Sequence, residues 1–324
     1  MARTSKRNSK GTGLVRLSKA AITRQDFWQS FLAGQLTANT RRAYQGDLRA
    51  FAEFIGGAEH LPQVDREAVI AYRSALVNDG LSPATINRRL SSVRQLMREA
   101  FLRNLIPANP ANGIRGLKVD RDYSPTAALS ALQVAQVLDA IDTSRLKGKR
   151  DMALLSLLAR SGMRRDEAAR VKVGDFTQDS GHTILPVEGK GGKTRRVKVG
   201  ADLLKVLRSW IAAAGLQPSD PLFPAMGKGD RVLREKAMST QGIADVVKDR
   251  VSSALGEEWR ARISPHSLRH SFITIALQAG CPLHRVQYTV GHADPRTTER
   301  YDRLRESLED NAADYVAKAL AAIS

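Results

Sequence analysis

Apolar side chains recur every three or four positions through the first third of the chain, a spacing that predicts amphipathic helices. In residues 37–55 a single stripe contains Tyr44, Leu48, Phe51 and Ile55. Short polar residues precede this stripe and can cap the start of the helix: Thr37, Asn39 and Thr40. The first ordered region of the chain is therefore expected to be helical.

Two further helices are expected in the same region. Residues 65–80 should form one that ends at Gly80, since glycine is favoured just past a helix C-terminus. Residues 82–101 should form another, because Ser82 can cap it and Pro83 suits a first helical turn. Its apolar stripe comprises Ile86, Leu90, Val93 and Met97.

The periodicity then breaks in residues 104–125, which are rich in Pro, Gly and Asn and have the composition of a linker. It resumes at Leu129 and is interrupted once more at about 171–199, where alternating apolar and polar residues predict strands. The expected helices in this second region lie at 131–142, 148–161, 164–171, 201–214, 239–254, 267–279, 282–290 and 305–322.

This layout predicts a mainly α fold with one small antiparallel β-sheet, divided into two domains. Residues 1–22 are rich in Lys, Arg, Ser and Gly and are expected to form a basic flexible tail. A helical domain should follow over 23–115, then a linker over 116–128 and a larger domain over 129–324. A chain of 324 residues has room for two such cores.

Charge narrows the class of partner. The chain has 51 Lys and Arg against 33 Asp and Glu, a formal net charge of +18, which favours a polyanion such as nucleic acid. No apolar run approaches the length of a bilayer span, and no lipidation motif is present, so a membrane partner is not expected. The one cysteine, Cys281, rules out an internal disulfide and suits a reducing cytoplasm.

A glycine- and lysine-rich stretch at residues 187–199 looks at first like an ATP-binding phosphate loop. That motif needs a glycine five positions before Gly192, where this chain has Val187. The flanking segments alternate as strands do, so the stretch is better explained as a β-hairpin with Lys190 and Lys193 at its tip.

Several side chains in the second region could together act on a phosphodiester. Arg164 and Arg269 could make forked, charge-assisted bonds to the two non-bridging oxygens. Tyr301 could attack phosphorus, His266 could accept the phenolic proton, and Lys190 could protonate the departing sugar oxygen. Each of these residues alone is more often an ordinary surface or core residue, so the inference depends on all of them together.

A zinc site is the other chemistry that the histidines could suggest. His266 and His270 are four residues apart on an expected helix, but no Glu lies between them in the metalloprotease pattern and no third ligand is evident. No metal or other cofactor is therefore expected.

The order and spacing of these motifs resemble the tyrosine site-specific recombinases of the phage-integrase and Xer type. The matching segments are Gly162-Met163-Arg164-Arg165-Asp166-Glu167, Gly189-Lys190-Gly191, His266-Ser267-Leu268-Arg269, Val290-Gly291-His292 and Tyr301. They lie between residues 162 and 301, all within the second expected domain. The resemblance as a whole covers about residues 25–315.

The resemblance implies catalytic roles at seven positions: Arg164, Glu167, Lys190, His266, Arg269, His292 and the nucleophile Tyr301. It implies a SAM-like, core-binding helical domain before the catalytic domain, both closing on double-stranded DNA as a C-shaped clamp. It also implies cleavage through a 3′-phosphotyrosyl ester without ATP or metal, by a homo-tetramer that joins two duplexes at specific recombination sites. A last helix at about 305–322 has an apolar stripe that could pack on its own domain or, as the resemblance favours, dock on a neighbouring protomer.

DNA contacts outside the catalytic residues are expected from basic side chains on the polar face of the helix at 82–101 and on the hairpin. These are Arg88, Arg94, Arg98 and Lys193. A type IB topoisomerase, a catalytically silent DNA-binding protein and a metal-dependent nuclease are the alternatives. Integration, cointegrate resolution and replicon-dimer resolution all remain open as roles, with or without an accessory protein or a paralogous recombinase.

Overall fold

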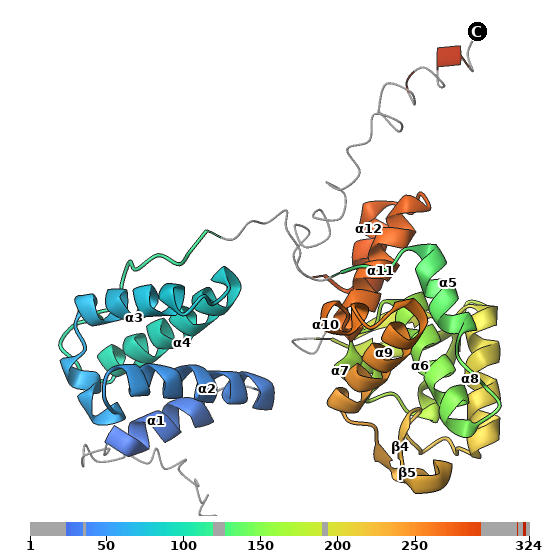
Figure 1. Cartoon of the computed structure of the whole chain (residues 1–324), viewed down its shortest axis with the longest axis horizontal. Coiled ribbons are helices and arrows are strands. Elements are labelled where there is room, and N and C mark those ends of the chain that lie inside the picture. The colour runs from blue at the N-terminus through green and yellow to red at the C-terminus, as the bar shows by residue number, and fades with distance from the viewer. Residues whose placement is uncertain are drawn as a thin grey trace, which may run out of the picture. The chain divides into compact units, whose positions relative to one another are not determined.

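A computed structural model describes residues 24–34, 37–118, 127–189 and 194–292, together with Val316, Leu320 and Ala321. The chain forms two compact units, Met1–Asp120 and Arg121–Ser324. Helices dominate both units, and the strands belong to the second (Figure 1). The prediction of a mainly α fold with a small antiparallel sheet is confirmed.

The first unit is a helical bundle, and some of its helices begin at the capping residues that the sequence predicted. Its elements are α1 (Arg24–Ala33), α2 (Ala38–Phe54), the 3₁₀ helix η1 (Ala58–Gln63), α3 (Arg66–Asn78) and α4 (Pro83–Leu102). The side chains of Thr37, Asp65 and Ser82 accept hydrogen bonds from the backbone N–H groups three residues later. Each cap satisfies a donor that the first helical turn would otherwise leave unpaired.

The expected apolar stripes form the core of this unit. Leu48 and Phe51 of α2 are buried against the stripe of α4, including Leu90 and Met97. Asn87 of α4 exchanges two hydrogen bonds with the backbone of Leu117, at 2.9 and 2.7 Å. The polar face of α4 therefore also fastens the chain that leaves the unit.

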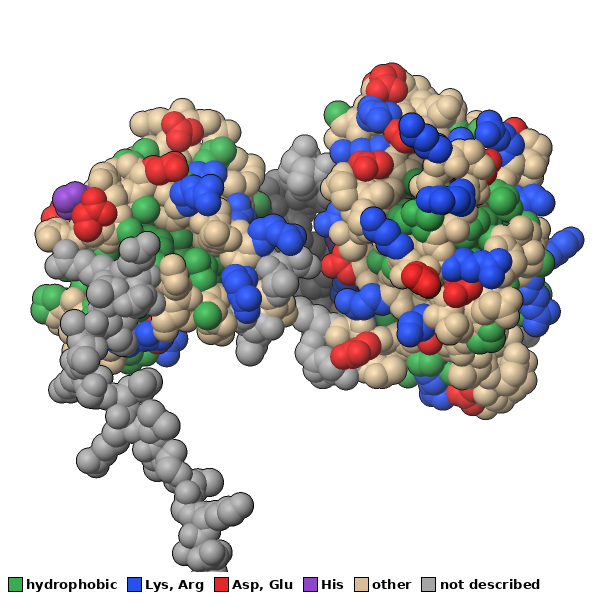
Figure 2. Space-filling model, turned by 90° about the horizontal axis from the view of Figure 1, so that it is seen from below, with side chains coloured by type: hydrophobic (Ala, Val, Ile, Leu, Met, Phe, Trp, Pro, Cys, Tyr) green, Lys and Arg blue, Asp and Glu red, His purple; other side chains and the backbone are tan. Residues whose placement is uncertain are grey.

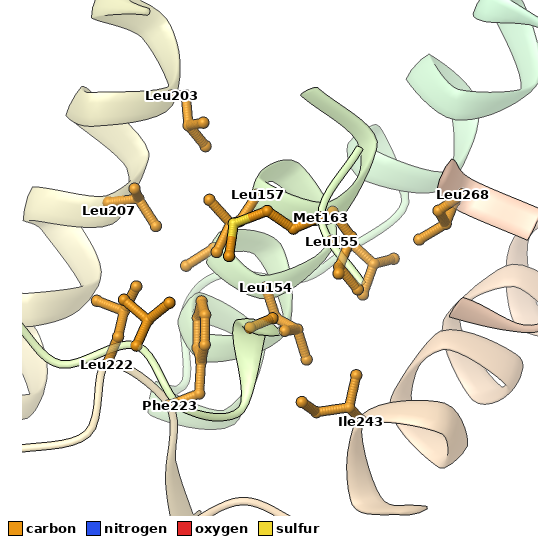
Figure 3. Close-up of a cluster of buried hydrophobic side chains, with 14 of the residues drawn as sticks. Leu154, Leu155, Leu157, Met163, Leu203, Leu207, Leu222, Phe223, Ile243 and Leu268 are labelled. Atoms are coloured by element: carbon orange, nitrogen blue, oxygen red, sulfur yellow. The ribbon is translucent and has the colours of Figure 1, made fainter. Parts of the chain in front are cut away.

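The second unit is built around α6 (Leu146–Ser161), which packs against α8 (Ala201–Ala214) and α11 (Pro265–Gln278). Its other helices are α5 (Ala131–Asp139), α7 (Arg165–Ala168), the 3₁₀ helix η2 (Val173–Asp175), α9 (Thr240–Leu255), α10 (Trp259–Arg262) and α12 (Leu283–Val290). Leucines of α6 meet side chains of α8, α9 and α11 in one continuous core (Figure 3). The helix expected at 164–171 is shorter in the structure, where α7 spans only Arg165–Ala168.

A three-stranded antiparallel sheet contains the predicted hairpin. Strands β1 (Thr177–Asp179), β2 (His182–Glu188) and β3 (Thr194–Lys198) pair in that order. Glu188 pairs with Thr194, so the hairpin prediction is confirmed up to its tip. The tip residues, including Lys190 and Lys193, lie outside the described residues.

A second, two-stranded sheet was not expected. It pairs β4 (Pro224–Met226) with β5 (Val232–Ala237) around the 3₁₀ turn η3 (Lys228–Asp230), with an irregularity in register after Pro224. Most side chains of β5 are exposed, so the strand lacks the alternating apolar pattern by which it could have been predicted. None of the helices in the described residues is both long and apolar enough to span a bilayer.

A left-handed turn at Gly162 connects α6 to the segment that follows it. Gly162 ends α6 with φ 61° and ψ 21°. A Cβ atom at this position would lie 2.6 Å from Cδ1 of Phe272 on α11. The turn therefore needs glycine twice, for its backbone conformation and for the close approach of α11.

Replacing Gly162 by Ala should lower the free energy of unfolding by about 2 kcal/mol or more, because strain in the left-handed region adds to the clash with Phe272. Gly181→Ala is a matched control, since its φ is +77° but nothing lies within 4 Å of the added carbon. The free energy of unfolding of that variant should fall by only about 1 kcal/mol. Guanidinium unfolding of the full chain measures both, and equal losses would show that the Phe272 contact is unimportant.

Candidate active site

Arg164 is held by its own helix. It is the N-cap residue of α7, and its backbone N–H donates to Oε2 of Glu167 at 2.7 Å. Its Nη1 donates to Oε1 of the same carboxylate at 3.0 Å. The Arg164 side chain is nevertheless 37% exposed, so the guanidinium is oriented by the protein and accessible to a ligand.

Glu167 is buried and paired twice. Besides Arg164, it accepts a forked pair of hydrogen bonds from Arg195 of β3, at 2.8 and 2.7 Å. Burial alone would raise the pKa of Glu167, but the hydrogen bonds from Arg195 and from the backbone N–H of Arg164, with the charge of Arg195, lower it to about 2. The carboxylate is therefore ionised at neutral pH and serves to hold arginines.

Arg269 of α11 is buried and joins distant parts of the chain. Its Nη1 donates to the carbonyl oxygen of Gly162, and its Nη2 donates to that of Val290, both at 2.6 Å. The side chain is 1% exposed. Arg164 lies two residues after Gly162, and His292 lies two residues after Val290. The hydrogen bonds of Arg269 therefore hold the segments of both residues close to α11.

The two predicted histidines lie in this cluster. His266 is in the first turn of α11, and its ring centroid is 4.8 Å from that of His270. His292 follows α12, which is capped by Gly291 with φ 67°. The backbone N–H of His292 donates to the carbonyl oxygen of Gln287 at 3.2 Å.

Both imidazoles are kept neutral by their surroundings. Desolvation and the nearby charges of Arg269 and Arg164 lower the pKa of His292 to about 3. Desolvation, followed by the charges of Arg269, Arg164 and Arg165, also lowers the pKa of His266, although that residue is exposed overall. A neutral imidazole can accept a proton at neutral pH.

The structure thus brings together five of the seven predicted site residues: Arg164, Glu167, His266, Arg269 and His292. Lys190 and Tyr301 lie outside the described residues, so their roles stay predictions. Within the described ranges, no group of three or more His, Cys, Asp or Glu side chains is arranged to hold a metal ion. The expected C-terminal helix is described only at Val316, Leu320 and Ala321, which are helical and exposed.

The predicted DNA contacts on α4 differ in how accessible they are. Arg88 donates to the buried carboxylate of Asp47 at 2.5 Å, yet its side chain is 49% exposed. Arg94 donates to the carbonyl of Ile114 at 2.5 Å and is partly buried, which gives it a structural role in the first unit. Arg98 is exposed. Arg88 and Arg98 are therefore the better placed of the three for phosphate contact.

Arg195 is the buried site residue that sequence reasoning missed. In β3 it lies on the same face as the buried Val197, since side chains alternate along a strand. An arginine at an inward-facing position of a strand needs a buried partner. The alternation of apolar and polar residues along β3 was therefore the signal from which a structural role for Arg195 could have been predicted. Figure 2 shows other Lys and Arg side chains spread over the surface of the second unit, with acidic side chains between them.

Comparison with known proteins assigns both units. A family model described as the phage integrase family matches residues 128–307, and one described as the phage integrase N-terminal SAM-like domain matches residues 25–104. A tyrosine recombinase of Synechococcus elongatus is 32% identical over 316 residues, which cover 93% of this chain and 96% of the relative. Tyrosine recombinase XerC of Xanthomonas campestris pv. campestris is 32% identical over 280 residues, covering 83% of this chain and 80% of the relative.

Solved structures share the fold. A XerH recombinase bound to a palindromic difH substrate, in a post-cleavage complex, aligns with a TM-score of 0.68 at 22% identity, covering 89% of this chain and 83% of that chain. A lambda integrase tetramer bound to a Holliday junction aligns with a TM-score of 0.67 at 16% identity, covering 89% of this chain and 79% of that chain.

The depressed pKa of Glu167 should make the second unit lose stability in acid. The carboxylate stabilises the fold fully above its unfolded pKa of 4.5, and this contribution is lost as pH falls towards about 2. Between pH 5 and pH 3 the free energy of unfolding of the wild type should fall by about 2 kcal/mol more than that of Glu167→Gln, because the glutamine side chain does not titrate. A Trp28→Phe background leaves Trp210 and Trp259, both in the second unit, as fluorescent reporters of guanidinium unfolding. Parallel pH profiles for the two proteins would contradict the assignment.

Proposed function

This chain belongs to the phage integrase family of tyrosine recombinases, and from that premise we propose how it cuts and rejoins DNA at specific sites. The prediction of a SAM-like helical domain followed by a recombinase catalytic domain is confirmed. One observation supports the proposed site most directly: the buried guanidinium of Arg269 binds the carbonyls of Gly162 and Val290 together. That contact supports an arrangement in which two guanidiniums and two neutral imidazoles act on one phosphate.

The reaction exchanges one phosphoester for another. The phenolic oxygen of Tyr301 attacks the scissile phosphorus, the bond from phosphorus to O5′ breaks, and a 3′-phosphotyrosyl ester remains. The phenolic proton passes to His266, and Lys190 donates a proton to the departing O5′. A 5′-hydroxyl of the partner duplex then attacks the ester and releases Tyr301. Because each step makes as many phosphoester bonds as it breaks, no nucleotide is consumed.

Arg164 and Arg269 stabilise the transition state of both steps. Negative charge on the two non-bridging oxygens increases as phosphorus becomes five-coordinate, and guanidiniums that are already oriented need not reorganise to meet it. Arg164 is oriented by Glu167 and Arg269 by the two carbonyls. His292 lies near both guanidiniums and could donate its ring N–H to the same phosphate.

The substrate is double-stranded DNA carrying specific recombination sites, and the acting form is a homo-tetramer on two duplexes. The net charge of +18 supports a DNA partner, and the XerH and lambda integrase structures that share this fold contain DNA. The lambda integrase tetramer on a Holliday junction supports the assembly. Arg88 and Arg98 of the first unit would add phosphate contacts, and a protein that acts on DNA in this way would work in the cytoplasm.

Exchange of strands between duplexes distinguishes this proposal from DNA relaxation by a type IB topoisomerase. The curated relatives are named tyrosine recombinases, which favours strand exchange. The same chemistry serves integration and excision, cointegrate resolution and replicon-dimer resolution, with or without an accessory protein or a paralogous recombinase.

Replacing Tyr301 by Phe should abolish the covalent protein–DNA adduct on a nicked suicide substrate while leaving binding of a single site unchanged, because only the attacking oxygen is lost. Gel electrophoresis in denaturant measures the adduct. Tyr288→Phe is a matched control, since Tyr288 of α12 is 64% exposed, and it should retain the adduct. An adduct that survives in Tyr301→Phe would identify a different nucleophile.

Replacing Lys190 by Ala should slow cleavage by about 100-fold or more, because the departing sugar oxygen loses its proton donor. A 5′-bridging phosphorothiolate substrate releases a thiolate that needs no proton, so it should largely restore the rate. Lys193→Ala, measured on both substrates, compares the second lysine of the same hairpin. If the sulfur substrate rescues Lys193→Ala and not Lys190→Ala, Lys193 is the acid.

A further inference from the structure

Arg195 and Glu167 form a buried ion pair between β3 and α7. Arg195 is 7% exposed and Glu167 is 3% exposed, so both charges are largely removed from water. Such a pair is stable only when its hydrogen bonds are nearly complete. Here the fork of Arg195 supplies Nη1 to Oε1 at 2.8 Å and Nη2 to Oε2 at 2.7 Å.

The carboxylate of Glu167 is fully used. Its Oε1 accepts from the Nη1 atoms of Arg164 and Arg195, and its Oε2 accepts from the backbone N–H of Arg164 and the Nη2 of Arg195. An ionised carboxylate has about four acceptor positions, and four donors occupy them. Its rotation is therefore blocked, and the direction from which it holds Arg164 depends on Arg195.

The Nε atom of Arg195 reaches a third segment. Its Nε donates to the carbonyl oxygen of Thr289 in the last turn of α12, at 3.0 Å. A Cβ atom on Gly291 would lie 3.0 Å from Cδ of Arg195, so the arginine stem packs against the residue before His292. The neighbouring carbonyl, that of Val290, binds Arg269. Arg195 thus contacts the segments that orient Arg164, Arg269 and His292.

We propose that Arg195 is a positioning residue that keeps the Arg164 guanidinium directed at the scissile phosphate and leaves its charge available to that phosphate. This inference rests on the proposed function. The Nη1 and Nη2 atoms of Arg195 bind Glu167 and its Nε binds the carbonyl of Thr289, so its role is to hold other residues and not the DNA. Arg164 shares the Glu167 carboxylate with Arg195. Without the charge of Arg195, Glu167 would be the counter-ion of Arg164 alone and would compete more strongly with the phosphate for that guanidinium.

The test compares a phosphodiester suicide substrate with one carrying a methylphosphonate at the scissile position. The methyl group replaces a non-bridging oxygen and removes the negative charge that the arginines neutralise. For each protein the ratio of the two single-turnover cleavage rates is independent of the fraction of folded enzyme, because that fraction multiplies both rates. A loss of stability alone therefore leaves the ratio unchanged.

Arg195→Met should slow phosphodiester cleavage by roughly 100-fold, since a small misplacement of a catalytic group costs about that much. The rate ratio of phosphodiester to methylphosphonate should fall by about tenfold or more, in the same direction as for Arg164→Ala. Arg195→Lys keeps the charge but loses the fork, so its ratio should fall less. Single-site binding should change by less than about threefold, because Arg195 does not contact DNA.

Arg196→Met is the matched control. Arg196 is the next residue of β3, its side chain is 61% exposed, and its partners are Asp179 of β1 and the exposed Tyr288 of α12. The variant removes the same charge from the same strand and should keep the wild-type ratio.

An unchanged ratio in Arg195→Met would overturn the positioning role. If that variant does not fold, Arg195→Lys decides, and a wild-type ratio in it would equally overturn the proposal. A wild-type protein that forms no adduct on the phosphodiester would instead refute the proposed function, so the two failures are distinguishable.

Discussion

The site depends on a buried guanidinium held between the C-terminal ends of two helices. Arg269 donates to Gly162, the residue that ends α6, and to Val290, the last residue of α12. Carbonyls at a helix C-terminus lack partners within the helix and carry the negative end of its dipole. Two such ends can therefore stabilise a cation that is 1% exposed without cancelling its charge as a carboxylate would. A neutralised arginine would have little to offer a phosphate.

The same end of α12 receives a second arginine. Thr289 and Val290 offer consecutive carbonyls, one to Arg195 and the other to Arg269. Arg195 continues to Glu167, and Glu167 to Arg164, so a chain of charge-assisted bonds joins α12, β3, α7 and α11. Within the residues that the structure describes, this chain of bonds includes one carboxylate and three guanidiniums. The surplus of positive charge is what a phosphodiester would balance.

The sequence predicted much of the fold through local rules and failed where a rule needed tertiary information. Helix starts at Thr37 and Ser82 follow from short capping side chains and a periodic stripe, and the structure has both. The motif residues at 164, 266, 269 and 292 were predicted from their order, which reflects the chemistry they would share. Strand β5 was missed because its side chains are mostly exposed and show no alternation. Arg195 was missed because its role depends on a hydrogen-bonded ion pair with Glu167, which is 28 positions away in the sequence.

The neutral histidines show how such a site could respond to its substrate. Desolvation and the charges of Arg269 and Arg164 hold the pKa of His292 at about 3 and lower that of His266. A phosphodiester bound between the two guanidiniums would offset their charge, and the imidazole pKa values would rise towards their usual range. His266 would then accept a proton more readily with DNA in place than without it. The positive charge that attracts the phosphate would thus also keep His266 a poor proton acceptor until DNA is bound.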